Sequence, residues 1–389
     1  MSLRVLHVIE AMHQGGAESL VVEHVRLASP DVSSSVVALN RGGPSLIAAQ
    51  AAGAEVLVLG KGAKRLGGLM RLAAIMRERR IDVVNGHNPI GAMYATAAAR
   101  IAGVRAVIRT EHSIHYPGRG SGLYGPVEAL LTPLCDRVIC VCEAARASHA
   151  ARHPLWRSRF VTVWNGVSAA PQDEPGRESA RAALGLAPAQ RVALHVGSLT
   201  VQKAQDVLLR AFAQVCAAVP EAVLLIAGEG VLREPLLALH RELGLGERVR
   251  FLGARTDVPA LMAACDLYVL SSAREGLSIT LLEAMRARRA CVATAVGGNA
   301  EAIADGVTGR IVPVGDAAAM AAAVRALLTD PVQLAAFAEA GHARWRERFT
   351  AQAMVADTER IYREVLERAG HPALAPAGGR GAAAPRAER

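Results

Sequence analysis

The chain has 389 residues, of which 52% are hydrophobic and 20% are charged, so it is long enough for two domains with substantial cores. This composition excludes a disordered chain and a small disulfide-stapled domain. No apolar run approaches the roughly 20 residues that cross a bilayer, and the start of the chain is interrupted by charge too early for a secretory signal. We therefore expect a cytoplasmic protein rather than an integral membrane protein.

The net charge of +9 is divided unevenly along the chain. Residues 1–168 carry 19 Lys and Arg against 11 Asp and Glu, whereas the remainder carries 25 against 24. Much of the excess lies between Lys61 and Arg80, where basic residues alternate with leucines at helical spacing. We favour an ordinary helix whose apolar stripe faces the core. The alternative is a patch that contacts an anionic acceptor or, peripherally, the inner face of the cell membrane.

Nucleic acid is not an expected partner, because only 3% of the residues are aromatic and no nucleic-acid-binding motif is present. The cysteines lie in apolar segments without paired spacing, which is typical of reduced thiols in a core rather than of disulfides or a zinc site. These cysteines are Cys135, Cys140, Cys142, Cys216, Cys265 and Cys291.

Short apolar or β-branched runs alternate with longer helical patterns, which is typical of a parallel sheet with crossover helices. The strands predicted in the first part of the chain are Leu3–Ile9, Ser35–Leu39, Glu55–Leu59, Ile81–Asn85, Ala106–Thr110, Arg137–Cys142 and Phe160–Trp164. A polar stretch with Pro and Gly, residues 169–178, predicts a linker. The strands predicted after it are Val192–Val196, Ala222–Ala227, Val249–Leu252, Leu267–Leu270, Cys291–Ala295 and Arg310–Val314.

Helices are predicted near the end of the chain at Asp316–Leu328 and Ala351–Arg368. Residues 370–389 are rich in Ala, Gly, Pro and Arg, which predicts a disordered tail. The fold class is therefore α/β, with two doubly wound parallel-sheet domains at residues 1–168 and 179–350 and a last helix at 351–369.

Ligands of open α/β sheets bind beyond the carboxyl ends of the strands, so the loops that follow the predicted strands are the candidate sites. Glycines there let backbone N–H groups approach an anion at a helix N-terminus. Gly15 and Gly16, together with Gly197 and Lys203, form such a set for a diphosphate. Each glycine signal alone is weak, because many turns need glycine for their own geometry. Two facing sets of such loops imply a cleft between the domains.

A more specific pattern lies between Glu275 and Met285. Glu275 precedes a predicted helix and Glu283 lies about two turns into it, so both carboxylates can face a cleft. Carboxylates in that position accept hydrogen bonds from the hydroxyls of a sugar or a ribose. As a bare pair, two glutamates on a helix are more often solvated.

His112 follows a predicted strand and can approach a reacting group from the opposite wall, although a histidine at a strand end is as often a structural hydrogen-bond partner. The pairs His112/His115 and His149/His153 have spacings that suit a metal but no obvious third ligand, so we expect no metal. No Gly-x-Ser-x-Gly elbow, Walker loop or Gly-x-Gly-x-x-Gly fingerprint stands at a strand-helix turn. Hydrolase, ATPase and dehydrogenase functions therefore lack their usual motifs.

The order of these motifs resembles the GT4 family of retaining glycosyltransferases, which have the GT-B fold. The residues that carry the resemblance are Gly15-Gly16-Ala17-Glu18, Asn165-Gly166-Val167, Gly197 with Lys203, Glu275 with Glu283, and Val296-Gly297-Gly298-Asn299-Ala300-Glu301. It extends from about residue 3 to about residue 368 and is most specific between Phe251 and Gly315. It implies two Rossmann-like domains facing a cleft, the first binding an acceptor and the second a nucleotide-diphosphate sugar. It also implies a last helix that crosses back to the first domain.

The resemblance implies a role for each matching residue. Lys203 neutralises the donor diphosphate, which Gly16 approaches from the other domain. Glu275 binds hydroxyls of the donor sugar and Glu283 those of the ribose, while the main chain near Ala254 reads the base. The catalytic residues implied are Glu275, Lys203 and His112, the last near the transferred sugar, and the other donor-site residues are Gly15, Gly197, Ser198, Gly228, Gly276, Leu277 and Ser278.

The implied activity is metal-independent transfer of a hexose from a UDP- or GDP-sugar to a glycan or lipid-linked acceptor, in cell-surface polysaccharide or glycolipid synthesis, with no cofactor. The sequence departs from the family where Ser198 replaces Arg, Ala204 replaces Gly, and Arg288 and Ala290 replace Gly and Pro. Two alternatives stay open: a nucleotide-sugar 2-epimerase on the same fold, and a non-catalytic partner subunit that binds a nucleotide sugar.

Overall fold

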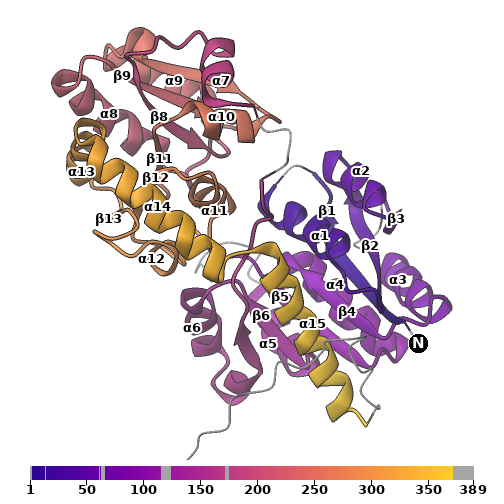
Figure 1. Ribbon diagram of the computed structural model, residues 1–389. Helices are drawn as coiled ribbons and strands as arrows, with labels where there is room; N and C mark the ends of the chain where they lie inside the picture. The colour runs from indigo at the N-terminus through magenta and orange to yellow at the C-terminus, as the bar shows by residue number, and fades with distance from the viewer. Residues whose placement is uncertain are drawn as a thin grey trace, which may run out of the picture. The chain divides into compact units, whose positions relative to one another are not determined.

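The computed structural model describes residues 2–13, 15–60, 62, 66–114, 124–170 and 175–370, which form two β-sheets (Figure 1). The strands of the first sheet are β1 (Leu3–Ala11), β2 (Val32–Arg41), β3 (Glu55–Val58), β4 (Val83–His87), β5 (Ala106–Glu111), β6 (Arg137–Cys140) and β7 (Phe160–Thr162). Those of the second are β8 (Arg191–Val196), β9 (Ala222–Ala227), β10 (Val249–Gly253), β11 (Leu267–Leu270), β12 (Ala290–Thr294) and β13 (Arg310–Val312).

Both sheets are wound outwards from a central strand. The first has the order β3-β2-β1-β4-β5-β6-β7, in which β1 pairs in parallel with β2 and β4, so that Val5 lies opposite Ser34 and Val83. The second has the order β10-β9-β8-β11-β12-β13, in which β8 pairs in parallel with β9 and β11. Because the strands are parallel, the loops after their carboxyl ends share one edge of each sheet. The predicted α/β class with two Rossmann-like sheets is confirmed.

Helices connect the strands of both sheets. Before residue 170 they are α1 (Gly16–Arg26), α2 (Pro44–Ala51), α3 (Leu66–Glu78), α4 (Asn88–Ala102), α5 (Tyr124–Leu131) and α6 (Glu143–Arg152), with 3-10 turns η1 (Thr132–Leu134) and η2 (Pro154–Arg159). After it they are α7 (Arg177–Ala183), α8 (Gln205–Ala218), α9 (Arg233–Glu242), η3 (Gly246–Arg248), α10 (Val258–Ala264), α11 (Ile279–Arg286), α12 (Asn299–Ala302), α13 (Ala317–Thr329), α14 (Pro331–Arg348) and α15 (Ala351–Arg368).

Each predicted strand is present, and α15 has the predicted bounds. The predicted linker ends inside α7, and its residues 171–174, like the tail from residue 371, lie outside the described residues. The helix α14 is not among the predicted helices, because its buried side mixes aromatic residues with small ones and lacks an apolar stripe: Phe337, Ala338, Gly341 and Trp345. Asp330 starts α14 by accepting hydrogen bonds from two backbone N–H groups of its first turn.

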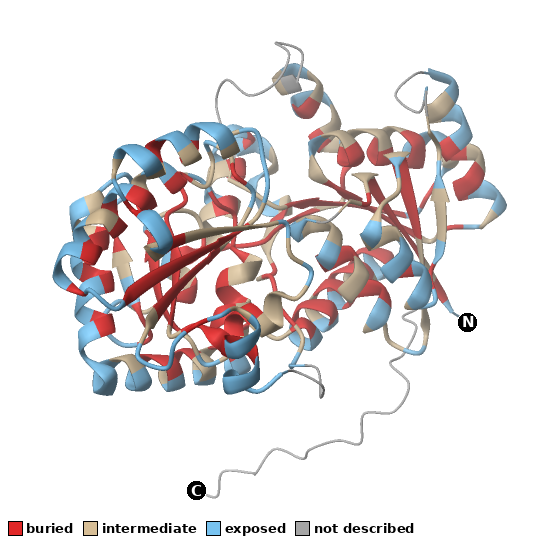
Figure 2. Cartoon of the chain, turned by 90° about the horizontal axis from the view of Figure 1, so that it is seen from above, coloured by how far each residue is buried: buried red, intermediate tan, exposed pale blue. Residues whose placement is uncertain are grey.

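The cores lie on the faces of the sheets, and Figure 2 shows the central strands as largely buried and the outward sides of the helices as exposed. On β1, Leu6 and Val8 belong to one apolar cluster and Ile9 to another, so helices cover both faces of the first sheet. A third cluster joins the second sheet to α8 and α13, for example through Phe212 and Leu267. All six cysteines are buried, as predicted.

By contacts, the chain divides into two compact units. The first unit contains residues 1–109, 125–137 and 355–389, and the second contains residues 110–124 and 138–354. The helix α15 joins the first unit, where Tyr362 accepts a hydrogen bond from Asn85 at 2.8 Å and Arg363 pairs with Asp31 at 3.1 Å. The predicted domain boundaries at 168 and 179 lie where the chain passes from the first sheet to the second. As boundaries of the folding units, they stay a prediction.

The predicted basic helix is α3, in the first unit. Leu72 and Ile75 are buried against the core, which confirms the ordinary interpretation for that part of the stripe. Leu66 at the start of the helix is 75% exposed and Met70 is 45% exposed, so the first turn of the stripe faces outward. The neighbouring Lys61, Lys64 and Arg65 lie outside the described residues.

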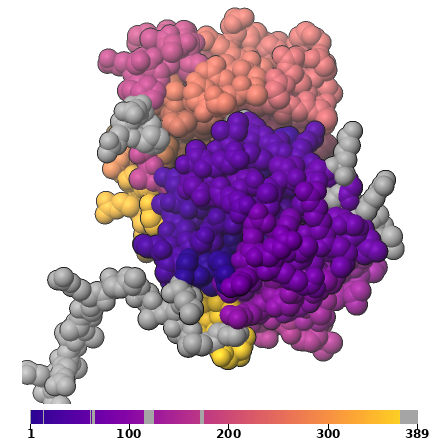
Figure 3. Space-filling view, turned by 90° about the vertical axis from the view of Figure 1, so that its right-hand side faces the viewer, coloured from indigo at the N-terminus to yellow at the C-terminus, as the bar shows by residue number. Residues whose placement is uncertain are grey.

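A groove of about 290 Å³ runs between α3 and the edge strand β3. Its lining includes apolar residues of β3 and the side chains of Arg71, Glu78 and Arg79. Figure 3 faces this side of the molecule, where the first part of the chain is drawn in indigo and purple. Among the helices that the structure describes, none combines the length and the apolar character needed to cross a membrane.

Candidate functional site

Backbone hydrogen bonds join the loops that follow β8, β9 and β10 in the second unit. The N–H of Leu199 donates to the carbonyl of Glu229 at 2.9 Å, and the N–H of Leu232 donates to the carbonyl of Leu199 at 3.0 Å. The N–H of Gly228 donates to the carbonyl of Gly253 at 2.7 Å, next to the exposed Ala254. The structure therefore brings together three of the loops in which the sequence places donor-binding residues.

The loops approach each other so closely that no residue with a side chain fits at two of the glycine positions. Gly228 has φ +146°, and a Cβ there would lie 2.0 Å from the carbonyl oxygen of Gly197. Gly230 would place a Cβ 2.3 Å from the carbonyl oxygen of Leu199. These positions need glycine for close backbone contact, so their first role is to hold the loops together.

Lys203 and Glu275, which lie 72 residues apart, meet in this region. The Lys203 ammonium donates to Glu275 Oε1 at 2.5 Å, and the Ser272 hydroxyl donates to the same oxygen at 2.7 Å. The carbonyl of Lys203 accepts from the Ser271 hydroxyl at 2.8 Å. The Lys203 side chain is 16% exposed and that of Glu275 is 7% exposed, so this is a largely desolvated ion pair fixed by two hydroxyls. The structure therefore brings these two predicted residues together, and their roles stay a prediction.

Beneath the first loop lies a pair of buried residues that sequence reasoning missed. His195 Nδ1 lies 3.0 Å from the carbonyl oxygen of Val269, and its Nε2 lies 3.2 Å from the side-chain nitrogen of Gln205. The same nitrogen of Gln205 donates to the carbonyl of Ser198 at 2.9 Å. Burial lowers the pKa of His195 to about 4, so the ring is neutral and accepts from Gln205. The pair fixes the backbone at Ser198, whose own side chain is exposed.

Gly276 brings the predicted His112 to the same region. A Cβ on Gly276 would lie 2.2 Å from the carbonyl oxygen of His112 and 3.0 Å from Val141 Cγ2. The carbonyl of Gly276 accepts from the Gly298 N–H at 2.5 Å and from the Cys142 thiol at 3.5 Å. The main chain of His112 therefore touches the loop that carries Glu275.

The remaining predicted residues of this loop start α11. Ser278 is its N-cap and accepts from the N–H of Leu281, and the carbonyl of Leu277 accepts from Asn165 at 2.9 Å. Glu283 is half-buried on the helix. The pKa of the Tyr268 hydroxyl is raised well above its usual value, mainly by burial, with contributions from the negative charges of Glu275 and Glu283. Both predicted carboxylates therefore lie near one tyrosine.

Gly15 and Gly16 lie in the first unit, at the start of α1. Gly15 is the N-cap in an extended conformation, and a Cβ on it would lie 2.5 Å from a carboxylate oxygen of Glu18. Burial raises the pKa of Glu18, which shows a desolvated carboxylate at the positive end of this helix. A side-chain carboxylate therefore lies at this turn, and the anion-binding role that the sequence predicts for Gly15 and Gly16 stays a prediction.

The histidine pairs take part in other contacts. His149 Nε2 lies 3.0 Å from the carbonyl oxygen of Ser113 and 3.9 Å from a carboxylate oxygen of Glu111. His153 stacks on Phe160 with ring centroids 5.7 Å apart. His149 and His153 therefore do not share a ligand position, and His115 lies outside the described residues.

Two departures from the family pattern have a clear backbone consequence. Ala204, directly after Lys203, has φ +47°, and Arg288, after α11, has φ +55°. Glycine adopts such left-handed conformations without the strain that a Cβ introduces. At these two positions, where the sequence pattern leads one to expect glycine, this chain has a left-handed backbone with a larger residue.

Comparison with known proteins gives two family matches. The model described as Glycosyltransferase Family 4 matches residues 14–170, and the model described as Glycosyl transferases group 1 matches residues 176–344. The N-acetyl-alpha-D-glucosaminyl L-malate synthase of Bacillus anthracis is 32% identical over 301 residues, which cover 76% of this chain and 78% of that protein. The D-inositol 3-phosphate glycosyltransferase of Thermobispora bispora is 32% identical over 329 residues, covering 78% of this chain and 75% of that protein.

Solved structures resemble the chain over nearly its whole length. Anabaena Alr3699/HepE, crystallised in complex with UDP and glucose, superposes with a TM-score of 0.81 at 22% identity, covering 92% of this chain and 99% of that one. The sucrose-phosphate synthase (tll1590) of Thermosynechococcus elongatus superposes with a TM-score of 0.79 at 19% identity, covering 95% and 100%. At these identities the likeness concerns the fold alone.

Proposed function

Because the chain belongs to the GT4 family of glycosyltransferases, with the GT-B fold, we propose that it transfers a hexose from a nucleotide-diphosphate sugar, with retention of the anomeric configuration and without a metal ion. The donor is a UDP- or GDP-sugar. UDP is the first nucleotide to test, because a protein of the same fold was crystallised in complex with UDP and glucose. The site residues proposed are those predicted from the sequence.

The observation that carries the proposal is the meeting of Lys203 and Glu275 among loops joined by backbone hydrogen bonds. Transfer breaks the bond between the sugar C1 and the diphosphate, so negative charge grows on the leaving phosphate. A cation already held in place stabilises that charge more in the transition state than in the bound donor. Lys203 supplies this cation, and Glu275, freed from it by the diphosphate, accepts hydrogen bonds from the sugar hydroxyls.

The other residues have positioning roles in the same proposal. Glu283 binds the ribose, the main chain near Ala254 reads the base, and His112 lies beside the transferred sugar. Gly16 approaches the diphosphate with its backbone N–H at the start of α1. Gly197 and Gly228 bring their loops together by close backbone contact, which holds the chain ahead of Lys203 in place for the diphosphate.

Retention follows if the acceptor attacks the face from which the diphosphate leaves. The acceptor oxygen then bonds to C1, the bond from C1 to the phosphate oxygen breaks, and the acceptor's proton passes to that phosphate oxygen. No protein base and no metal are needed in this step, and Lys203 stabilises the charge that remains.

The acceptor proposed is a glycan or a lipid-linked molecule of cell-surface polysaccharide or glycolipid synthesis. The support for it is the basic excess of residues 1–168 and the exposed Leu66 and Met70 on α3. A cationic surface with exposed apolar side chains favours anionic acceptors and peripheral contact with an anionic membrane.

The test is a thermal-shift screen of the full chain against UDP, GDP, ADP and dTDP, each alone and as common sugars, because a ligand that binds only the folded chain raises its melting temperature. We expect one nucleotide diphosphate to raise it, and Lys203→Met to abolish the shift. Arg325→Ala, which removes an exposed cation on α13, is the matched control and keeps the shift. Transfer with added EDTA and the anomeric NMR signal of the product test metal independence and retention. The absence of a shift with every nucleotide, in protein of native fold, contradicts the proposal.

A further inference from the structure

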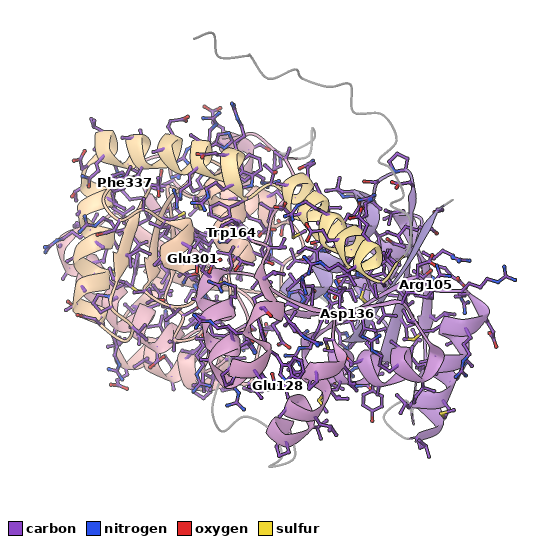
Figure 4. The ribbon with its side chains drawn as sticks, turned by 90° about the horizontal axis from the view of Figure 1, so that it is seen from below. Arg105, Glu128, Asp136, Trp164, Glu301 and Phe337 are labelled. Atoms are coloured by element: carbon purple, nitrogen blue, oxygen red, sulfur yellow. The ribbon has the colours of Figure 1, made fainter. Side chains whose placement is uncertain are left out.

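Glu301, on the short helix α12, joins three parts of the second unit through its carboxylate. Its Oε2 accepts from the backbone N–H of Glu143 at 2.9 Å and from the indole N–H of Trp164 at 2.8 Å. Its Oε1 accepts from the backbone N–H of Ala144 at 2.8 Å. Figure 4 shows the labelled Trp164 and Glu301 next to each other. One carboxylate thus accepts three N–H groups from segments more than 130 residues away in the sequence.

The N–H groups of Glu143 and Ala144 are the first ones of α6 and have no partner within that helix. A carboxylate at a helix N-terminus satisfies such groups and interacts favourably with the helix dipole. Glu301 therefore acts as the cap of α6 from outside, while the Cys142 thiol accepts from the next N–H, that of Ala145, at 3.4 Å.

The backbone of α12 is held separately from the other side. Arg344 on α14 donates to the carbonyl of Ala302 at 2.8 Å and to the carbonyl of Glu301 at 2.7 Å. The guanidinium of Arg348, also on α14, lies 4.7 Å from the centre of the Trp164 ring. A change confined to the Glu301 side chain therefore leaves α12 attached to α14.

The turn directly before α12 touches the loop of the proposed donor site. The N–H of Gly298 donates to the carbonyl of Gly276 at 2.5 Å. Gly297 has φ +52°, and a Cβ on it would lie 2.3 Å from the carbonyl oxygen of Glu275. Any movement of α12 relative to α6 is thus passed to the backbone at Glu275 and Gly276.

We propose that Glu301 is a positioning residue for the Glu275–Gly276 loop: by binding the start of α6 and Trp164, it fixes the turn on which that loop rests. The assignment of a catalytic effect rests on the proposed function, in which Glu275 contacts the donor sugar. Glu301 itself does not touch the donor in this proposal.

The test compares Glu301→Gln, Trp164→Phe and the control Glu339→Gln in the full chain. The glutamine keeps the shape of the side chain but has a single acceptor oxygen, and its amide group faces N–H donors. Trp164→Phe removes one of the three hydrogen bonds. Glu339, on α14, forms an exposed ion pair with Arg288.

The first readout is hydrogen–deuterium exchange, which needs no ligand. We expect Glu301→Gln to speed exchange at least fivefold at the amides of Glu143, Ala144 and Gly298 and across residues 275–278, with a smaller effect of Trp164→Phe and none of Glu339→Gln. Strands β8 and β9 keep the exchange of the unsubstituted chain. Unchanged exchange across residues 275–278 in Glu301→Gln overturns the positioning role.

The second readout is transfer kinetics with the donor identified by the thermal-shift screen. We expect Glu301→Gln to raise the donor KM about tenfold, the size of losing one charged hydrogen bond, with a melting temperature close to that of the control. A purely structural role instead lowers the melting temperature and the active fraction and leaves KM unchanged. If the unsubstituted chain binds no nucleotide, the proposed function fails, and the exchange experiment still decides whether Glu301 fixes the loop.

Discussion

The contact between Lys203 and Glu275 places two opposite charges in the proposed donor site, where a diphosphate needs only the positive one. A diphosphate has to compete with the Glu275 carboxylate for the ammonium, since that carboxylate oxygen lies 2.5 Å from Nζ. We therefore expect Glu275→Gln to leave the affinity for UDP unchanged or to raise it, because the competing charge is gone. The same substitution should lower the transfer rate about 10- to 100-fold, because a charged acceptor for the sugar hydroxyls is lost.

Calorimetric titration with UDP and single-turnover transfer measure these two quantities separately. Lys203→Met is the opposite control and should lower both, because the cation is removed. Ser272→Ala, which removes the hydroxyl 2.7 Å from the same carboxylate oxygen, should have a smaller effect on the rate. If Glu275→Gln lowers affinity and rate by the same factor, Glu275 does not compete for Lys203 and its role is misassigned.

The left-handed backbone at Arg288 predicts a stabilising substitution. Its φ of +55° strains a residue with a Cβ by about 1–2 kcal/mol. Glycine relieves this strain, but it makes the unfolded chain more flexible, which lowers the free energy of unfolding by about 0.4–1 kcal/mol. The side chain of Arg288 forms an exposed ion pair with Glu339, which adds little to stability. We expect Arg288→Gly to raise the free energy of unfolding by about 0.5–1 kcal/mol.

Urea unfolding followed by circular dichroism measures this gain as a higher midpoint at an unchanged slope. The matched control is Arg325→Gly, the same substitution at an exposed position inside α13, which should cost about 1 kcal/mol through helix propensity. A loss of stability in Arg288→Gly would mean that the arginine side chain contributes more than its exposure indicates.

At the scale of elements, three histidines connect β1, α1 and β4 in the core of the first unit. His7 Nδ1 lies 3.0 Å from His87 Nε2, and the rings of His7 and His24 stack with centroids 5.6 Å apart. Burial lowers the pKa of His7 to about 3, with a contribution from His24, and lowers that of His24 to about 4. The packing of these elements therefore depends on neutral imidazoles.

The sign of the pH dependence follows from these values. Below about pH 6.5 the unfolded chain binds protons at His7 and His24, whereas the folded chain does so only near pH 3 to 4, so the stability present above pH 6.5 is lost on acidification. The loss for the two residues amounts to about 4 kcal/mol at pH 5. Urea unfolding between pH 7.5 and 5 measures this loss of unfolding free energy. His24→Phe keeps a stacked ring but binds no proton, so it should halve the loss. An unchanged pH slope in His24→Phe would contradict this account.

The strands and the site loops could be predicted because their signals are local. An apolar run such as Leu267–Leu270 indicates a buried strand by itself, and the loop that follows it contains Glu275 within a few residues. The helix α14 could not be predicted in this way, because Ala338 and Gly341 occupy its buried side. Gly341 is small where the helix passes the carbonyl of Thr308, at 3.3 Å from an added Cβ, and only the fold reveals that neighbour.

Contacts between residues far apart in the sequence carry no such local signal. The Gln205 side chain that holds Ser198 depends on His195 and on the strand β11 beside it. The Glu301 carboxylate lies 158 residues from the N–H of Glu143. The loops that bear the candidate chemistry could thus be found from the sequence, while the residues that fix their shape required the structure.

At the scale of the whole molecule, the uneven charge makes a prediction about surfaces. The excess of basic residues lies in the first 168 residues, and α3 there exposes Leu66 and Met70 next to Arg71, which lines the groove against β3. Electrostatic attraction brings such a face to an anionic bilayer, and the exposed apolar side chains add burial at the interface. We expect the full chain to sediment with vesicles of phosphatidylglycerol and phosphatidylcholine and not with phosphatidylcholine alone.

Salt and substitution distinguish the electrostatic contribution to membrane binding from the apolar one. Raising the ionic strength from 50 to 300 mM should release most of the protein, because the attraction is screened over a shorter distance. Leu66→Ser with Met70→Ser should weaken binding at low salt several-fold, whereas the control Leu130→Ser, at a 72% exposed leucine on α5 of the same unit, should not. Equal weakening by the control would place the contact elsewhere on the first unit. If the chain binds neither kind of vesicle, we infer that the basic excess attracts an anionic acceptor in solution, because the same charges attract anionic lipids and anionic acceptors alike.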